Sequence, residues 1–202
     1  QRVDQGQHGE LRDALDQRWT LLMQWLGFDL IPIPNCLNEP AAWIESMNIS
    51  GFILSGGNDI GGLTGASQAS KERDALEHWI LIYASESKLP VLGVCRGMQM
   101  LAYHYGLTLE KVSGHVGVRH PVFSTSNDWF ETSSFEVNSY HSYGIPAQAM
   151  PEGLEVLAHD LNGYIEALRH REHRQLGILW HPEREQPFGS QDLGLIRQFF
   201  SS

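Results

Sequence analysis

The first half of the chain alternates between segments with helical periodicity and short apolar runs typical of buried strands. From Leu11, apolar residues recur at spacings of three and four up to Leu26, which predicts a helix that ends at Gly27. Residues 28–34 (FDLIPIP) are predicted to form a short edge strand, and residues 39–47 (EPAAWIESM) a second helix with proline in its first turn. A further strand is expected to end at residues 1–3.

Two more strand-and-helix pairs follow, and then the pattern changes. An apolar run at 51–54 leads into a glycine-rich turn and a helix over 71–88, and a second run at 90–94 leads into a helix from 96. After residue 107 the chain contains short strand-like runs at 107–112, 120–124, 133–139, 154–160, 163–170 and 175–181. One last amphipathic helix is predicted at 192–200. The alternation predicts an α/β fold with three α/β/α layers around a central, mostly parallel sheet, as a single domain over 1–202.

Composition narrows the range of partners. The 202 residues include 14 basic and 24 acidic side chains, a net charge of −10, without a basic cluster that could follow a phosphate backbone. Nucleic acid is therefore not expected as a partner. No apolar run reaches the roughly 20 residues that span a bilayer, and no leader sequence is recognised. We expect a cytoplasmic protein with reduced cysteines that acts on a small molecule.

Cys95 stands at the corner between the predicted strand 90–94 and the helix that follows, in the sequence G-V-C-R-G. Such a turn pushes the side chain clear of the sheet and places it over a helix N-terminus, which favours a thiolate. Gly93 and Gly97 would permit the sharp turn. A buried structural cysteine at the end of a strand is an equally good interpretation of this motif alone.

Two other motifs favour a nucleophile. His181-Pro182-Glu183 follows the strand at 175–181, so a base and the carboxylate that would orient it come from one strand end. The turn at 54–59 (LSGGND) follows another strand, and its glycines could aim a backbone N–H group at an oxyanion. Each motif alone is common in surface turns, but the three together predict acyl-transfer chemistry.

Taken together, these motifs resemble the class I glutamine amidotransferase superfamily over nearly the whole chain. The stretches CRGMQ, ERDALE and EVNSYHSYGI are similar to its γ-glutamyl hydrolase branch, the peptidase C26 type. The resemblance implies a nucleophile (Cys95), a general base (His181) and a carboxylate that orients it (Glu183). It also implies an oxyanion hole built from backbone N–H groups of Gly57 and Arg96, and a glutamyl pocket formed by Gln99, Tyr140, His141, Ser142 and Tyr143.

The implied reaction is hydrolysis of a γ-glutamyl amide through a glutamyl thioester, without a metal or organic cofactor. The branch includes hydrolases of γ-glutamyl-γ-aminobutyrate, but those tend to read N-S-x-H-H-Q where this chain reads N-S-Y-H-S-Y. The stretch LRDALDQRW, with Arg12 and Arg18, is similar to members found with surface-polysaccharide genes. One such type cleaves a γ-glutamyl cytidine diphosphoramidate, so both leaving groups stay open.

Two alternative functions also stay open. The chain could be the glutaminase subunit of a two-protein amidotransferase that feeds ammonia to a synthase, although the C-R-G form argues against this. It could also be a non-enzymatic redox sensor, because elbow cysteines occur in oxidation-responsive proteins of similar fold.

The remaining polar motifs are interpreted structurally. Asp74 and Glu77 are expected to charge a helix N-terminus. His115 and His120 are expected in a loop near the site, where they would cap backbone groups. His170 and His173 are expected in a solvated basic turn, without a nearby cysteine to complete a zinc site.

Overall fold

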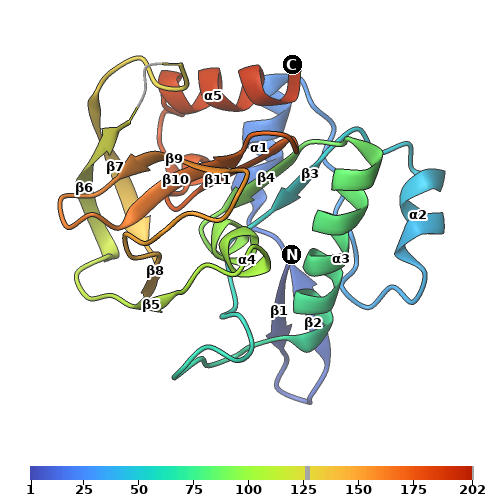
Figure 1. Ribbon diagram of the computed structural model, residues 1–202. Coiled ribbons are helices and arrows are strands. Elements are labelled where there is room, and N and C mark those ends of the chain that lie inside the picture. Colours follow the sequence, from blue (N-terminus) through green and yellow to red (C-terminus); the bar gives the residue numbers. More distant parts are fainter. Residues whose placement is uncertain (126–127, 202) are drawn as a thin grey trace.

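A seven-stranded sheet forms the centre of the protein, in a computed structural model that describes residues 1–125 and 128–201 (Figure 1). Its strand order is β3-β4-β11-β10-β9-β6-β7. In chain order the strands are β3 (Phe52–Leu54), β4 (Val91–Val94), β6 (Val116–Ser124), β7 (Ser134–Tyr140), β9 (Leu154–His159), β10 (Ile165–His170) and β11 (Gln175–Ile178).

The three strands at one side of this sheet run parallel to one another. β4 pairs with β3 and with β11, in a register that aligns Val94 with Ile178. The carboxyl ends of these strands therefore lie at one edge, where ligand sites form in open α/β sheets. The other neighbouring pairs, from β11/β10 to β6/β7, are antiparallel. The predicted parallel arrangement thus holds for β3, β4 and β11, whereas the remaining pairs are antiparallel, with short hairpins joining β9 to β10 and β10 to β11.

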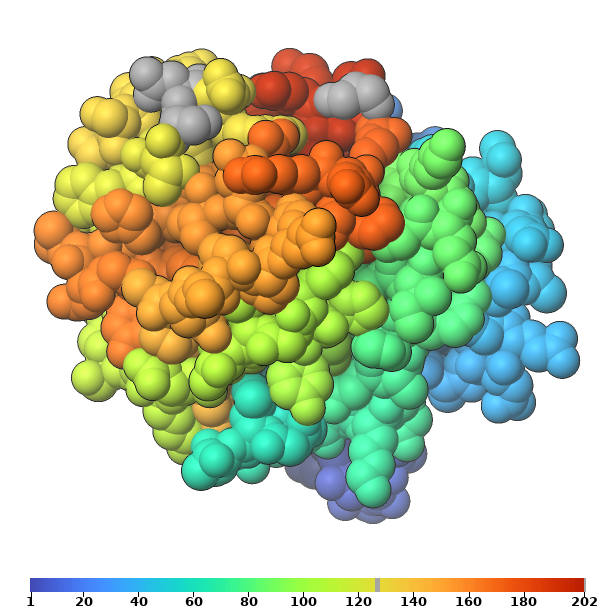
Figure 2. Space-filling model, viewed as in Figure 1, coloured from blue at the N-terminus to red at the C-terminus, as the bar shows by residue number. Residues whose placement is uncertain are grey.

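Helices cover both faces of the sheet, which confirms the three-layer prediction. α1 (Gln17–Leu26) and α5 (Ser190–Ser201) pack on one face, through a buried cluster that includes Trp19, Leu22 and Ile196. α2 (Pro40–Ser46), α3 (Lys71–Ser87) and α4 (Arg96–His104) contribute to the cluster on the opposite face. In Figure 2, α3 and α4 in green and the segments after residue 150 in orange make up most of the visible surface.

Two predictions for the N-terminal part are wrong. Leu11 does not begin a helix: Leu11–Ala14 forms β2, which pairs with β1 (Arg2–Gln5) in a separate hairpin, and α1 begins only after Asp16 caps it. Residues 28–34 form no strand. Because Pro32 and Pro34 lack N–H groups, this segment is poorly suited to pair with β3, and together with β3 it lines a cavity of about 430 Å³.

The other predicted helices are confirmed, and Gly27 ends α1 in the left-handed conformation, with φ 85°. Of the predicted strand at 107–112, only β5 (Glu110–Lys111) forms, paired with β8 (Tyr143–Gly144). Within the described ranges, the helices are too short or too polar to cross a membrane.

Candidate active site

Cys95 occupies the sharp turn between β4 and α4 that the sequence predicts. Its backbone has φ 53° and ψ −107°, a conformation that costs a non-glycine residue about 1–3 kcal/mol. The two flanking glycines make this turn possible. A Cβ on Gly97 would lie 1.9 Å from the carbonyl oxygen of Leu54, and a Cβ on Gly93 would lie 2.6 Å from the carbonyl oxygen of Gly97. The helix therefore starts directly against β3 and β4, with the thiol above its N-terminus.

His181 follows β11, and the short 3₁₀ helix η1 (Pro182–Arg184) returns the carboxylate of Glu183 to its ring. The distance from His181 Nδ1 to Glu183 Oε1 is 2.6 Å, and both side chains are buried. His181 also lies close enough to Cys95 for the two side chains to shift each other's pKa. The three residues at two parallel strand ends are thus brought together in the order thiol, imidazole, carboxylate.

The charges in this group favour a thiolate beside an imidazolium. Burial alone would raise the pKa of Cys95, but the charge and hydrogen bond of His181 outweigh burial and lower it. Burial alone would lower the pKa of His181, but the thiolate and Glu183 raise it to about 10. At neutral pH the proton therefore resides on the imidazole rather than on the sulfur.

The glycine turn after β3 lies directly against this group. A Cβ on Gly56 would come within 2.8 Å of His181 Cε1 and 3.6 Å of Cys95 Cβ, so only glycine fits beside the imidazole. Gly57 has φ 129°, a conformation that favours glycine, and its Cβ position faces Arg2 and Arg73. The turn therefore places backbone groups, rather than side chains, next to the thiol.

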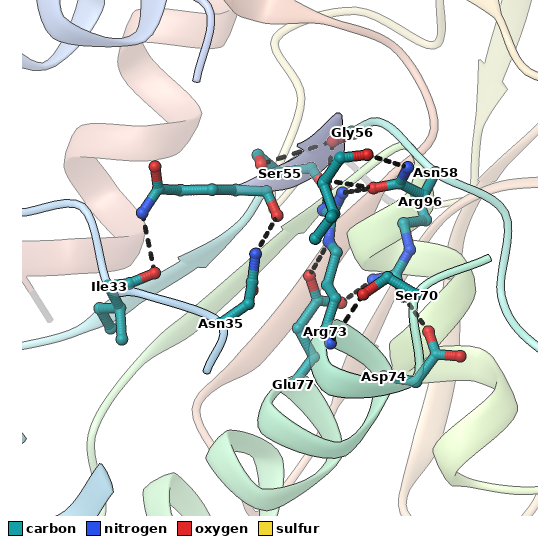
Figure 3. A network of polar contacts seen from close by, with 12 residues as sticks. Ile33, Asn35, Ser55, Gly56, Asn58, Ser70, Arg73, Asp74, Glu77 and Arg96 are labelled. Atoms are coloured by element: carbon teal, nitrogen blue, oxygen red, sulfur yellow. Dashed lines mark hydrogen bonds and ion pairs between the residues drawn. The ribbon is translucent and has the colours of Figure 1, made fainter. Parts of the chain in front are cut away.

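A buried ionic network holds this turn and the start of α4 together (Figure 3). Arg96 points away from the thiol and forms ion pairs with Asp74 and Glu77 of α3. Glu77 also accepts a 2.7 Å hydrogen bond from Arg73 Nε. Arg73 Nη2 in turn donates to the carbonyl of Ser55 at 2.6 Å. Asp74 lies in the first turn of α3, as predicted, while Glu77 lies beyond it, and both also pair with Arg96 and so link α3 to the start of α4.

The predicted glutamyl-pocket residues lie on the other side of the thiol. Gln99, on α4, donates from Nε2 to the backbone oxygen of Tyr143 at 2.8 Å, so the two predicted elements meet. His141 is buried, and its charge acts on Cys95. Tyr140 packs edge-on against the His181 ring, with ring centroids 5.7 Å apart. Ser142 is exposed.

His115 and His120 do not lie in a loop that only caps backbone groups. His120 is in β6 and His115 immediately precedes it, and both rings face His141 and Glu166 of β10. One ligand-type atom from each of these four side chains lies within 4.8 Å of the others. Among the described residues, this is the group whose side chains could hold a metal ion.

Sequence reasoning did not identify Asn138 of β7, which fixes the position of His181. Its side chain accepts from the His181 backbone N–H at 2.9 Å and donates to the His181 carbonyl at 2.8 Å. The stretch EVNSYHSY was noted only for its resemblance, and no spacing rule links 138 to 181.

Arg18, whose role the sequence left open, donates to the backbone oxygens of Glu183 and Glu185 at 2.9 and 2.5 Å and so holds η1. Arg12, by contrast, is exposed and pairs with Glu10.

Comparison with known proteins identifies the family of this chain. The family model described as glutamine amidotransferase class-I matches residues 24–201. The chain is 34% identical to the γ-glutamyl-CDP-amidate hydrolase of Campylobacter jejuni, over 95% of this chain and 90% of that protein. It is 30% identical to a glutamine-hydrolysing GMP synthase subunit of Methanocaldococcus jannaschii, over 80% of this chain and 78% of that one.

A solved structure shares the fold. The crystal structure of a candidate GMP synthase subunit from Thermoplasma acidophilum matches with a TM-score of 0.73 and 20% identity, over 98% of this chain and 90% of that one. The family model covers most of the chain, and both curated relatives exceed or reach 30% identity over more than two thirds of it. The chain belongs to the class I glutamine amidotransferase family.

Proposed function

We propose that the protein hydrolyses a γ-glutamyl amide and releases L-glutamate, with Cys95 as the nucleophile, His181 as acid and base, and Glu183 as the carboxylate that orients His181. The observation that carries this proposal is the arrangement of the site, with Cys95 on a strained elbow beside His181 and Glu183 Oε1 2.6 Å from His181 Nδ1. The likeness to the C. jejuni hydrolase supports the same chemistry.

The reaction proceeds in two steps. The Cys95 thiolate attacks the γ-carbonyl carbon, and negative charge moves to the carbonyl oxygen, which the N–H groups of Gly57 and Arg96 stabilise. His181 then gives its proton to the leaving nitrogen, the C–N bond breaks, and a glutamyl thioester remains. Water attacks the thioester while neutral His181 takes its proton. The C–S bond breaks, which releases glutamate and restores the thiolate–imidazolium pair.

The surroundings of the site favour an anionic leaving group. Arg2 on β1 lies beside Gly57, where the position of a Gly57 Cβ would be 2.5 Å from Arg2 Cβ. On the other side, the Arg184 guanidinium lies 4.3 Å from the centroid of Tyr140, the ring that packs against His181. The Arg184 guanidinium fits the phosphate charges of a nucleotide phosphoramidate, which outnumber the single carboxylate of γ-aminobutyrate, whereas the Arg2 guanidinium is paired with Asp4. We therefore propose a γ-glutamyl nucleotide phosphoramidate as the first substrate to test, followed by γ-glutamyl-γ-aminobutyrate.

A second candidate function is that of a glutaminase which supplies ammonia to a separate synthase. The relationship to the M. jannaschii protein favours it, because that protein is by its name one subunit of a glutamine-hydrolysing GMP synthase. This function uses the same three residues but requires a partner. The test is whether purified protein alone hydrolyses γ-glutamyl compounds or hydrolyses glutamine only after a synthase is added.

The deciding experiment combines a substrate panel with intact-mass analysis. Glutamine, γ-glutamyl-γ-aminobutyrate and a γ-glutamyl nucleotide phosphoramidate are compared by kcat/KM, and Cys95→Ala should abolish turnover while the variant stays folded. A glutamyl adduct on Cys95 during turnover supports the hydrolase. Retained activity in Cys95→Ala refutes the mechanism, and only oxygen adducts under peroxide would indicate a redox sensor instead.

A matched pair of variants tests the leaving group. Arg184→Gln should raise KM for the phosphoramidate by at least about tenfold and leave glutamine hydrolysis nearly unchanged, since only the charged leaving group reaches the guanidinium. Arg197→Gln, on the exposed face of α5, serves as the control for charge alone. Equal effects of Arg184→Gln on both substrates would contradict the assignment of Arg184 to the leaving-group side.

A further inference from the structure

Three histidines and one glutamate converge in the antiparallel part of the sheet. His115 and His120 come from the start of β6, His141 follows β7, and Glu166 lies on β10. Glu166 is fully buried and His141 is 2% exposed, while the His120 side chain, at 15%, leaves a route to solvent. Four groups of the types that bind metals thus share one largely buried site.

The inner atoms of this cluster have no hydrogen-bond partners among the described residues. They are both carboxylate oxygens of Glu166, Nδ1 of His115, Nε2 of His120 and Nε2 of His141. The three nitrogens lie 4.0, 3.8 and 3.5 Å from Glu166 Oε1, in that order. A buried carboxylate without a partner is strongly unfavourable, so either a metal ion or a proton is expected among these atoms.

The outer nitrogens of the three rings show which atoms carry hydrogen. His141 Nδ1 lies 3.0 Å from the Tyr143 carbonyl, and His120 Nδ1 lies 3.3 Å from the Pro121 carbonyl. His115 Nε2 lies 3.5 Å from the Asp160 carboxylate. Each outer nitrogen faces an acceptor and is therefore assigned the N–H, which leaves a lone pair on each inner nitrogen. Metal-bound histidines have this arrangement, with the second N–H held by a carbonyl or carboxylate.

We propose that His115, His120, His141 and Glu166 bind one divalent transition-metal ion of the zinc class. Three imidazoles and one carboxylate suit such an ion and do not suit Mg²⁺ or Ca²⁺, which prefer oxygen ligands. Tetrahedral zinc with bonds of 2.0–2.1 Å places its ligand atoms about 3.3 Å apart. The cluster needs only a small inward movement to reach that spacing, since its largest separation is 4.8 Å. The proposal replaces the expectation from sequence that no metal is bound.

The charge balance also fits a divalent ion. Zn²⁺ with Glu166 and three neutral imidazoles carries a net charge of +1, and Asp160 behind His115 neutralises it. The rival occupant is a proton shared between Glu166 and His141. Burial would lower the pKa of His141, but the nearby Glu166 carboxylate raises it overall. A bound metal ion can be distinguished from this proton, because it binds as one ion per chain and, when the ion is Co²⁺, gives a visible absorption spectrum.

The proposed ion would act as a structural clamp near the thiol. The Tyr143 carbonyl that accepts from His141 also accepts from Gln99, so the metal would fix the segment that faces Cys95. Metal binding would therefore hold β6, β10 and the segment after β7 in one arrangement. Its principal effect would be on thermal stability and on the order of this segment, with no step of the proposed hydrolysis passing through the metal.

The test uses the full chain as Cys95→Ala, so that the thiolate does not compete for the metal. After chelator treatment and dialysis, Co²⁺ is titrated as the probe. We expect one Co²⁺ per chain with the visible spectrum of a tetrahedral site, no thiolate-to-cobalt charge-transfer band, and displacement by Zn²⁺. Zn²⁺ at 100 times its Kd should raise Tm by about 5–11 °C.

Variants locate the site. His120→Asn should weaken Co²⁺ binding by at least about 100-fold, and Asp160→Asn by about 10–100-fold. His104→Asn is the matched control, because His104 and His78 form another imidazole pair, with Nδ1 atoms 3.1 Å apart. If His120→Asn does not fold, as judged by circular dichroism, Glu166→Gln replaces it.

Loss of binding in His104→Asn with retention in the cluster variants would overturn the proposal. Failure of the protein to bind a stoichiometric metal ion would overturn it as well, and would assign the cluster to a shared proton.

Discussion

Replacing Glu77 by Gln tests whether the buried ionic network holds the site together. Glu77 is 3% exposed, and its two carboxylate oxygens contact Arg73 and Arg96. Glutamine keeps the size but leaves two buried guanidinium groups with only Asp74 as a counter-charge. Breaking a buried ion pair in this way costs about 3–5 kcal/mol of unfolding free energy. For a chain of this length that corresponds to a Tm lower by about 6–20 °C.

The same substitution should reduce activity. Arg73 donates to the carbonyls of Ser55 and Gly56 at 2.6 and 3.1 Å, so a loosened Arg73 releases the turn beside His181. We expect kcat to fall by about tenfold or more, since small misplacements of reacting groups cost up to about 100-fold. The measurements are urea unfolding and steady-state kinetics. Glu86→Gln, on the exposed side of α3, is the control and should change stability by less than about 0.5 kcal/mol.

The difference in unfolding free energy between wild type and Glu77→Gln should depend on pH in a defined direction. Burial would raise the pKa of Glu77, but Arg96 and Arg73 outweigh burial and lower it in the folded protein. The stabilisation is therefore fully present above the unfolded pKa of about 4.3 and is lost as pH falls through the lower folded pKa. The gap between wild type and Glu77→Gln should narrow only in that acidic range. A variant within about 1 kcal/mol of wild type at pH 7 would refute the role of the network.

Three further predictions concern the site itself. Gly56→Ala should lower kcat by about 100-fold, because the new methyl group displaces the His181 ring. Gly194→Ala, whose Cβ would meet no atom within 4 Å, should leave kcat unchanged; equal activities would contradict the contact. In a pH profile, kcat/KM should have two limbs. On the acidic side it should fall as pH drops through the pKa of Cys95, which lies below the usual thiol value of about 8.5. On the alkaline side it should fall as pH rises through about 10, because His181 then loses its proton. An alkaline limb near pH 7 would refute the ion pair. Arg18→Gln should cost about 1–3 kcal/mol in urea unfolding and lower kcat, and an unchanged kcat would show that η1 holds its position without Arg18.

The sequence predicted those parts of the site that depend on local chain geometry. A cysteine between two glycines at a strand end identified the elbow, and His-Pro-Glu placed His181 and Glu183 two residues apart. The same local reasoning failed where distant contacts decide the structure. The apolar spacing from Leu11 fitted a helix, yet residues 11–14 pair with β1 instead.

The groups that position the site were also beyond local reasoning. Asn138 and His181 are 43 residues apart, and Arg18 and Glu183 are 165 apart, so only the folded sheet brings each pair together. The cluster around Glu166 was invisible for the same reason, since its four residues come from three strands and their flanking loops. Local periodicity carries no information on which antiparallel strands become neighbours.

Because the Asn138 side chain holds the backbone of His181 in place, enzymatic activity should appear late in folding. β7 is an edge strand of the sheet, so His181 gains its contacts with Asn138 only after that edge has docked. Contacts between residues far apart in the sequence, such as Asn138 and His181, form slowly compared with helices. During refolding from denaturant, far-UV ellipticity should therefore recover before turnover does, and the delay would measure how long Asn138 and His181 take to come together.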